Sequence, residues 1–483
     1  MTSVSSIIMI VSFIIVVLLI LSEKINRAIV AIAGAVVTYY TLVFIDGKDF
    51  SVVVGIIFGT SEDGFVNLKS LILIFGMMVV IGIAEEAGVF QFLAAYVIKK
   101  SNGNPISLLV IFCFLAVICS AILNNIVTVM MLIPLTIMIS RILNTNPTPY
   151  ILSEAVLVNV GGTIFSISSI PNILITTESG ITFPDFLFNV GLFSILVVIL
   201  TVPLFLFLYK PDLTYPDDEL VEILAEFDVW NVVQSKALFF TSLLSIIALI
   251  GAFFIIPPEV LSPDMIAITI AIMLLFITYF QDVDGELILK KLDYQLILYL
   301  IGIFAIAGGL EITGVINTIG TELKSIGHGF SPLVQVLFIM WIAAILSSVV
   351  DNIPITKILL PIVHDFIPAT SSPQVSKNYY YGLAFGANWG DNLTPLGDNI
   401  LIVNLAQQNK RPIKIFDFWR LGFVTTVYQL ILATLYFTLL FNLLLGIILI
   451  GIILCSIIIL MVLSMKITWL SQFKLTIRKT IVG

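Results

Sequence analysis

Long apolar segments recur along the chain, and short polar or charged stretches separate most of them. Apolar runs of about 18 or more residues are typical of helices that cross a membrane. The pattern therefore predicts membrane helices, two of them broken by glycine, proline and polar residues. The predicted spans are 5–21, 28–45, 69–86, 150–183 (broken), 186–208, 237–256, 264–281, 293–311, 379–408 (broken), 418–441 and 444–465.

Two further apolar stretches, at about 105–141 and 332–366, are too long for one helix each, and each has a polar break at its centre. By length alone, each could be a kinked span, two spans or a re-entrant hairpin. A single crossing would separate Lys210, Lys290 and Lys291 from the other basic loop residues, whereas a hairpin keeps them all on one side. Basic loops mark the cytoplasm, so hairpins or even numbers of crossings are favoured, with the N-terminus outside and the C-terminus inside.

Three blocks of the first half recur in the second half in the same order. They are residues 67–90 with 293–316, 120–134 with 347–361, and 159–169 with 388–398, at shifts of 226, 227 and 229 residues. Five helices and one hairpin per half make an odd number of crossings, so we expect an inverted repeat, a device of many secondary transporters. The predicted fold is an all-α polytopic membrane protein with one re-entrant hairpin in each half and an extra C-terminal helix.

The boundaries of the predicted parts follow from this repeat and from the charge of the connecting segments. They are a first repeat at 1–208, an acidic cytoplasmic linker at 209–236, a second repeat at 237–441, and an extra helix with a basic cytoplasmic tail at 442–483. The linker separates the two halves, and its acidic residues carry little weight in setting orientation.

Polar residues inside apolar runs mark a candidate binding site, because hydrocarbon tolerates them only where they line a protein cavity. The candidate substrate- or ion-binding residues are Asn124, Asn125, Thr128, Asn159, Gly161, Gly162, Thr163, Ser168, Asn172, Asp351, Asn352, Thr356, Asn388, Asp391, Asn392, Thr394 and Asp398. Their oxygens, with carbonyls freed at helix breaks, suit a hard cation such as sodium near Asn125, Asn352 and Asp391. The half-helix N-termini suit an anion, so the architecture leaves the sign of the substrate open.

Charged residues of the second half favour a cation. Asp351, Asp391 and Asp398 are expected near the membrane midplane, with Lys357 as the buried base beside them. Burial disfavours the charged form of an acid or a base, so Asp351, Asp391 or Lys357 could exchange a proton for a cation. The structural alternative is that Lys357 pairs with Asp351 or Asp391 and locks the hairpin. Glu154 is expected to reach the membrane interface.

Composition excludes several other classes of protein. The chain is 59% hydrophobic and 11% charged, whereas soluble proteins carry about 25% charged residues. It has no basic stripe for nucleic acid, and its three cysteines form no CxxC pair. No motif of a membrane-embedded enzyme is present. The expected partners are therefore the lipid bilayer, a small inorganic ion and a coupling ion, H+ or Na+, with no other cofactor.

Several sequence strings resemble a known group of transporters. GMMVVIGIAEEAGVF, VVDNIPITKILLP and GANWGDNLTPLGDNILI are similar to segments of the ion transporter superfamily, from about Ile25 to Phe441. The nearest branch holds arsenite permeases, D-type sodium/proton antiporters and the P protein, with dicarboxylate and citrate carriers as cousins. The resemblance implies that the hairpin at 105–141 opens inward and that at 332–366 outward. It also implies a transport domain that holds the hairpins, and a scaffold that forms a homodimer.

The chain departs from that family in both broken helices, and it has Gly390-Asp391 where arsenite permeases often carry Gly-Pro. Ser168 and Ser169 stand where the family commonly has Gly-Asp, and Asp398 adds an acid in the second half. The leading hypothesis is a proton-coupled antiporter for a small cation, most simply sodium, in the plasma membrane. The alternatives are an arsenite or antimonite efflux permease and a sodium-coupled di- or tricarboxylate transporter.

Overall fold

The structure is a computed structural model that describes residues 3–22, 24–216, 228–281, 285–327, 329–368, 370–395 and 399–452. Every regular element in these ranges is helical. Nine of the described helices are long and apolar enough to cross a membrane. The predicted all-helical, multi-pass membrane fold is therefore confirmed.

Helices of the first half follow the predicted spans closely and add two short ones. They are α1 (Val4–Leu21), α2 (Arg27–Tyr40), α3 (Phe50–Phe58), α4 (Val66–Glu86), α5 (Val89–Lys100), α6 (Pro105–Ile122), α7 (Asn125–Ile142), α8 (Thr148–Gly161), α9 (Ile170–Ser179), α10 (Phe183–Phe186) and α11 (Leu192–Tyr209). Two segments are π-helical. Thr41–Ile45 extends α2, and Leu187–Gly191 joins α10 to α11.

Helices of the second half come in a corresponding order. They are α13 (Lys236–Ile255), α14 (Pro263–Tyr279), α15 (Gly285–Lys291), α16 (Tyr294–Ile312), α17 (Val315–Gly327), α18 (Pro332–Ser347), α19 (Asn352–Phe366), α20 (Pro373–Gly390), the 3-10 turn η5 (Asp391–Leu393), α21 (Asn399–Gln408) and α22 (Ile415–Phe441). A short apolar helix, Leu443–Ile452, follows. The rest of the predicted last span lies outside the described residues.

The sequence pattern did not predict the short helices α3, α5, α15 and α17. With 7 to 13 residues each, they fall below the roughly 20 residues that a span requires. Gly88 and Gly314 start α5 and α17 at equivalent places, with positive φ angles of 80° and 79°. A Cβ on Gly88 would lie 2.4 Å from the carbonyl oxygen of Val232. Glycine therefore allows the sharp turn from a long helix into a short one.

Two helical hairpins are built on capped turns. Asn124 caps α7 by accepting from the backbone N–H of Val127, and Asp351 caps α19 by accepting from that of Ile353. Such side-chain acceptors satisfy N–H groups that a helix start leaves unpaired. We call α6 with α7 the first hairpin and α18 with α19 the second hairpin. Their tips are the segments between the paired helices.

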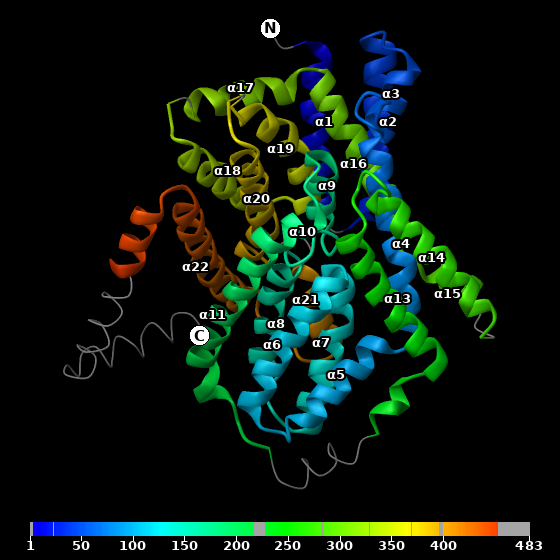
Figure 1. The fold of residues 1–483 in the computed structure, drawn as a ribbon, viewed down its shortest axis with the longest axis vertical. Helices are drawn as coiled ribbons and strands as arrows, with labels where there is room; N and C mark the ends of the chain where they lie inside the picture. The colour runs from blue at the N-terminus through cyan, green and yellow to red at the C-terminus, as the bar shows by residue number, and fades with distance from the viewer. Residues whose placement is uncertain are drawn as a thin grey trace.

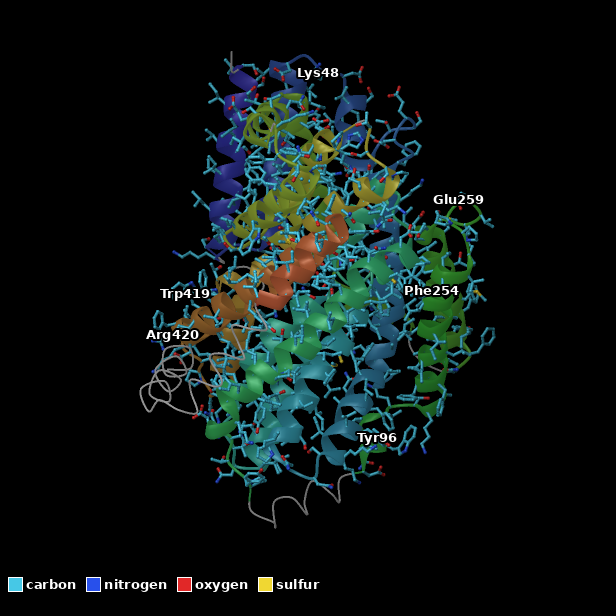
Figure 2. All side chains as sticks on the ribbon, turned by 60° about the vertical axis from the view of Figure 1, so that its left-hand side comes forward. Lys48, Tyr96, Phe254, Glu259, Trp419 and Arg420 are labelled. Atoms are coloured by element: carbon cyan, nitrogen blue, oxygen red, sulfur yellow. The ribbon has the colours of Figure 1, made fainter. Side chains whose placement is uncertain are left out.

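Equivalent helices pack in the same way within each half and across the two halves. The first hairpin packs on α8 through α6, and the second hairpin packs on α20 through α18, while α2 packs on α16 and α14 on α4. In Figure 1, α17–α19 lie in the upper part and α5–α7 in the lower part. Lys48 and Tyr96 lie towards opposite ends in Figure 2, and Phe254 and Trp419 lie on the flanks between them. The inversion of one repeat relative to the other stays a prediction.

Candidate functional site

Each hairpin docks on a broken helix through a glycine. A Cβ on Gly161, the last residue of α8, would lie 2.8 Å from the Cα of Val117. A Cβ on Gly390, the last residue of α20, would lie 2.3 Å from the Cα of Ala344. Backbone this close leaves no room for a side chain. The glycines therefore hold each hairpin directly against the end of its broken helix.

A serine hydroxyl reinforces each of these docking contacts. Ser120 on α6 lies 2.5 Å from the carbonyl oxygen of Val158. Ser347 on α18 lies 2.6 Å from that of Ala387. Ser120 and Ser347 stand at equivalent positions of the aligned blocks, as Val158 and Ala387 do. The two halves thus build the same hairpin contact twice.

An asparagine bridges each helix break. Between α8 and α9, the side-chain amide of Asn172 donates to the carbonyl of Gly162 at 2.8 Å. Between α20 and α21, the side-chain amide of Asn399 donates to the carbonyl of Asp391, also at 2.8 Å. Both asparagines begin the string Asn-Ile-Leu-Ile. Each bridge satisfies a buried carbonyl that the break would otherwise leave without a helical partner.

Side-chain amides connect the first hairpin tip to the second break. The Asn125 amide donates to Oδ1 of Asn159 at 2.6 Å. The Asn159 amide lies 2.7 Å from Oδ1 of Asn392 and 3.3 Å from Oδ2 of Asp391. The Asn399 amide also lies 3.3 Å from that carboxylate oxygen. We call these five residues the amide network.

The first break has its own, uncharged set of contacts. Asn388 on α20 donates to Oδ1 of Asn172 at 2.8 Å and accepts from the Ser169 hydroxyl at 2.5 Å. The Trp389 indole donates to Thr163 at 3.1 Å. Asn159 of one broken helix thus reaches into the second break, and Asn388 of the other reaches into the first. The two breaks are therefore locked to each other.

Asp391 is the acid at the centre of the amide network. Its side chain is 3% exposed, and amide N–H groups of Asn159 and Asn399 approach it. A buried carboxylate needs such donors or a cation. An asparagine side chain carries both an oxygen and an NH2 group, so rotation of its amide exchanges a donor for an acceptor. The same residues can therefore surround an ionised carboxylate or add oxygen ligands for a cation.

A cavity lies where the two hairpin tips meet the first break. It is lined by Arg27, Asn124, Asn125, Ile126, Ser169, Ile170, Pro171, Asp293, Leu296, Asn352 and Ile353. The first residues of α7, α9 and α19 all belong to this lining. Helix N-termini carry a partial positive charge and unpaired N–H groups. The tip cavity therefore combines oxygen ligands with features that attract an anion.

The tip cavity continues into a cleft along α4, towards Glu85 and Lys291. The cleft shares Asn124, Ile170, Asp293 and Leu296 with the tip cavity. A separate cavity lies towards the N-terminus of α4, and its lining includes Lys69, Thr176 and Asp264. Ile167 lines both the cleft and the separate cavity. Ile167 therefore stands at the boundary between the cleft and the separate cavity.

Comparison with protein families gives a match over residues 17–378 to the family described as citrate transporter. This match covers well over half of the chain. The chain belongs to the citrate transporter family. An uncharacterized transporter of Mycobacterium tuberculosis is 25% identical over 420 residues, which is 86% of this chain and 94% of that protein. The human P protein is 24% identical over 84% of this chain, but only 56% of that protein is matched.

Two solved structures are similar in fold to this citrate transporter family member. The YdaH transporter of Alcanivorax borkumensis has a TM-score of 0.52 and 17% identity, over 82% of this chain and 88% of that one. MtrF of Neisseria gonorrhoeae, described as illuminating a class of antimetabolite efflux pumps, has a TM-score of 0.55 and 15% identity, over 91% and 95%. The predicted superfamily is confirmed, and the chain is a transporter.

The carboxylate of Asp351 is held by contacts with three other residues. The Tyr299 hydroxyl donates to its Oδ2 at 3.0 Å, and Arg27 lies 3.9 Å from the same oxygen. Its other oxygen caps α19. Asn352 lines the tip cavity, and Thr356 donates to the Asn352 carbonyl. The second hairpin tip is thus anchored by Asp351, while Asn352 faces the cavity.

Lys357 does not lie beside either aspartate. It pairs with Glu178 at the end of α9, with 2.9 Å between Nζ and Oε2. The structural alternative, a pair between Lys357 and Asp351 or Asp391, is therefore wrong. The two residues are in α19 and α9, which pack together, and a helix contact of this kind is not visible in the spacing of the sequence.

The remaining predicted residues are distributed around the two breaks. Ser168 donates towards the carbonyls of Gly162 and Phe165, and Thr394 bonds the carbonyl of Ser348. Thr128 is fully buried, and its hydroxyl has no hydrogen-bond partner. Asp398 lies outside the described residues. Glu154, expected at the interface, is instead completely buried in α8.

Sequence reasoning missed three residues that shape the site. Arg27 was overlooked because it stands just before the predicted span 28–45, where basic residues are common. Tyr299 was overlooked because it lies within the apolar predicted span 293–311. Ser120 was overlooked although it aligns with Ser347 in the repeat. Its alignment with Ser347 at the shift of 227 residues could have identified Ser120 as part of the site.

Proposed function

We propose that this transporter exchanges protons for a small cation, most simply sodium, by alternating access. The observation that carries the proposal is Asp391, a buried carboxylate in a helix break that is surrounded by side-chain amides. A proton or a sodium ion can each neutralise such a group. Because both compete for the same oxygens, binding of one requires release of the other, which is the basis of antiport.

The surroundings of Asp391 support a site that changes its ligands. Oδ1 of Asn392 and the carbonyl of Asp391 lie within reach of the same Asn399 amide. Sodium prefers oxygen ligands, as other hard cations do. Rotation of the Asn159 or Asn399 amide would turn an oxygen towards the carboxylate in place of an N–H group. The bound cation would then replace two amide donors.

The access route supports alternating exposure. The cleft along α4 reaches the hairpin tips from the end that holds Glu85 and Lys291. The cavity beyond Ile167 lies on the other side of the first break. A shift of the hairpins and broken helices against α4 would close one route and open the other. By the distribution of basic residues, the open route in this state is the cytoplasmic one.

Purified protein in liposomes with an enclosed pH-sensitive dye tests the proposal. Sodium, lithium, arsenite and citrate are added in separate samples under an imposed pH gradient. Sodium is expected to change the internal pH, and Asp391→Asn is expected to remove that response. Asp185→Asn is the matched control, because Asp185 pairs with Lys377 outside the amide network. A response to arsenite or citrate without any to sodium would contradict the proposal.

Carriage of a carboxylate with a coupling cation is the second candidate. It is favoured by the tip cavity, where Arg27 and the N-termini of α7, α9 and α19 converge. A carboxylate accepts hydrogen bonds from such groups. In that case Asp391 would hold the coupling cation, and the anion would sit in the tip cavity. Citrate uptake that requires sodium or a proton gradient, and that Arg27→Gln abolishes, is the outcome that would favour this function.

A further inference from the structure

Glu154 is a buried carboxyl group that the amide network does not include. It lies in the middle of α8 and is 0% exposed. One of its oxygens accepts a hydrogen bond from Thr136 on α7 at 2.8 Å. The other oxygen, Oε2, has no hydrogen-bond partner. An acid in this condition is unusual, because buried polar atoms are normally paired.

Buried polar atoms with few hydrogen-bond partners recur on α7, α8 and the loop between them. Five of the thirteen buried side-chain atoms without a partner, among the described residues, lie on α7, α8 or the loop between them. Besides Glu154 they include the hydroxyls of Ser140, Thr145 and Tyr150. Tyr150 stands four residues before Glu154, and Ser140 four residues after Thr136, so each pair shares a helix face. Thr145 lies beside Tyr150.

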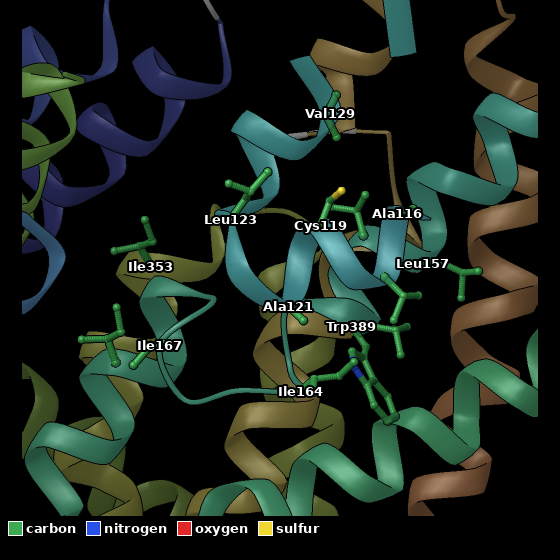
Figure 3. Close-up of a cluster of buried hydrophobic side chains, with 14 of the residues drawn as sticks. Ala116, Cys119, Ala121, Leu123, Val129, Leu157, Ile164, Ile167, Ile353 and Trp389 are labelled. Atoms are coloured by element: carbon green, nitrogen blue, oxygen red, sulfur yellow. The ribbon is translucent and has the colours of Figure 1, made fainter. Parts of the chain in front are cut away.

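These side chains stand on the packed helices α7 and α8 and their connecting loop, with Thr136 bonded to Glu154 at one end and Thr145 beside Tyr150 at the other. We call Thr145, Tyr150, Ser140 and Thr136 the hydroxyl ladder. A hydroxyl both donates and accepts a hydrogen bond, so a series of them, with water between, can pass a proton along. Around the ladder the packing is apolar, and Figure 3 shows Ala116, Cys119 and Leu157 in one buried cluster. The ladder therefore offers a proton a polar route from the α7–α8 loop to Glu154.

The charge of Glu154 has no basic partner among the described residues. α8 itself carries Tyr150. On the elements packed against α8 the titratable groups are Cys113 and Cys119 on α6, Arg141 on α7, Tyr209 on α11, Asp391 in η5, Lys377, Tyr379, Tyr380 and Tyr381 on α20, and Asp417, Arg420, Tyr428 and Tyr436 on α22. Arg141 is exposed and bonds the Asn409 carbonyl instead. An isolated buried carboxylate is strongly unfavourable, whereas its protonated form costs far less. The burial and the unpaired oxygen of Glu154 therefore favour its neutral form.

The fold does not require an acid at this place. At the shift of 229 residues that relates the broken helices, Glu154 corresponds to Leu383 on α20, which is fully buried. An aliphatic side chain thus satisfies the packing in the second half. The acid of the first half and the polar ladder beside it call for a role other than packing.

From these observations we infer that Glu154 is a second proton-binding site, loaded along the hydroxyl ladder from the α7–α8 loop. A proton from water adds to Oε2 and returns to water by the same route, with no other bond made or broken. The role of the bound proton in transport rests on the proposed function. Proton binding by Glu154 does not, because it needs no transported ion.

Infrared spectroscopy of the full chain in a maltoside detergent, which has no ester carbonyl, tests the inference. The carbonyl stretch of a protonated carboxylic acid should be present at neutral pH and disappear as pH rises. Measured with sodium present, which displaces the proton proposed for Asp391, Glu154→Gln, which keeps the shape and the Thr136 contact, should lose this band. Asp264→Asn, which removes another buried acid far along the chain, should retain it. A band unchanged in Glu154→Gln would overturn the inference.

The ladder has a separate test that leaves Glu154 intact. After transfer to heavy water, the carboxyl band should shift as its proton exchanges, and Tyr150→Phe should slow that shift severalfold. An exchange rate that Tyr150→Phe does not change would overturn loading along the ladder, even if Glu154→Gln fails to fold. A wild-type protein that shows the band but no sodium-driven proton movement in liposomes would contradict antiport and leave the Glu154 site standing.

Discussion

The two helix breaks share one backbone arrangement and differ in charge. Asn172 holds the carbonyl of Gly162 and Asn399 holds the carbonyl of Asp391, both at 2.8 Å. Gly162 and Asp391 are equivalent in the repeat. The same carbonyl is therefore fixed in the same way, yet only the second break carries a carboxylate. The geometry of a break comes from glycine and asparagine, and the acid is an addition to it.

The hairpin tips show the same division. Asn124 caps one hairpin and Asp351 caps the other. Asp351 adds a charge, but Tyr299 and Arg27 approach it. An acid that caps a helix and faces a guanidinium has a structural explanation. Among the described acids of the second half, Asp391 is thus the one whose place in a helix break points to coupling.

The largest effect is expected where the breaks differ most. Asp391→Asn keeps the size of the side chain and removes its charge and its proton. Proton movement driven by sodium in liposomes should fall to the level of empty liposomes, because the competing ions lose their shared ligand. Asp351→Asn should retain part of the activity, since Asp351 caps a helix. Equal, complete loss in both variants would show that the two acids act as one site and break the comparison.

The next effect concerns what the breaks share. Gly390→Ala and Gly161→Ala place a methyl group 2.3 and 2.8 Å from the backbone of Ala344 and Val117. Overpacking of this kind destabilises by about 1–3 kcal/mol, and more is expected for Gly390. Thermal unfolding in detergent measures it. Gly251→Ala is the control, because no atom lies within 4 Å of the added group. Equal melting temperatures for all three would contradict the glycine contacts.

A third test separates the bridge from the carboxylate. Asn172→Ala and Asn399→Ala each remove one amide donor from a buried carbonyl, and Gly162 keeps the Ser168 hydroxyl as a donor. The net loss of one such hydrogen bond is about 0.5–1.5 kcal/mol. Both should lower the melting temperature similarly. Only Asn399 also approaches the Asp391 carboxylate, so Asn399→Ala alone should change the sodium concentration needed for half-maximal transport. An equal change in Asn172→Ala would mean that the breaks contribute alike to ion binding.

Much of this arrangement was predictable from the sequence. Apolar length and the repeat located the long helices, and α8 and α20 end at Gly161 and Gly390, inside the segments predicted to be broken. Polar residues in apolar runs pointed to Asn125, Asn159 and Asp391 because hydrocarbon selects against them. These signals are local, or they recur at a fixed shift, and a single sequence displays both kinds.

Contacts between distant helices were not predictable in the same way. Asn159 and Asp391 are 232 residues apart in the chain, and no periodicity reports that they meet. Glu154 was expected at the interface because a charge in an apolar segment often reaches towards water. Its complete burial follows from the packing of α6 and α7 against α8. Which buried charge pairs with which depends on tertiary packing alone.

The smallest effect is expected for Lys357, a basic residue of the second hairpin that stands outside the amide network. Its ammonium group pairs with Glu178, and the two side chains are 14% and 28% exposed. Pairs that water reaches contribute about 0–1 kcal/mol, so Lys357→Gln should lower stability by less than about 1 kcal/mol and leave sodium-driven proton movement nearly unchanged. A double-mutant cycle with Glu178→Gln, followed by thermal unfolding, measures the pair. If Lys357→Gln lost transport as completely as Asp391→Asn, Lys357 would have to take part in proton coupling.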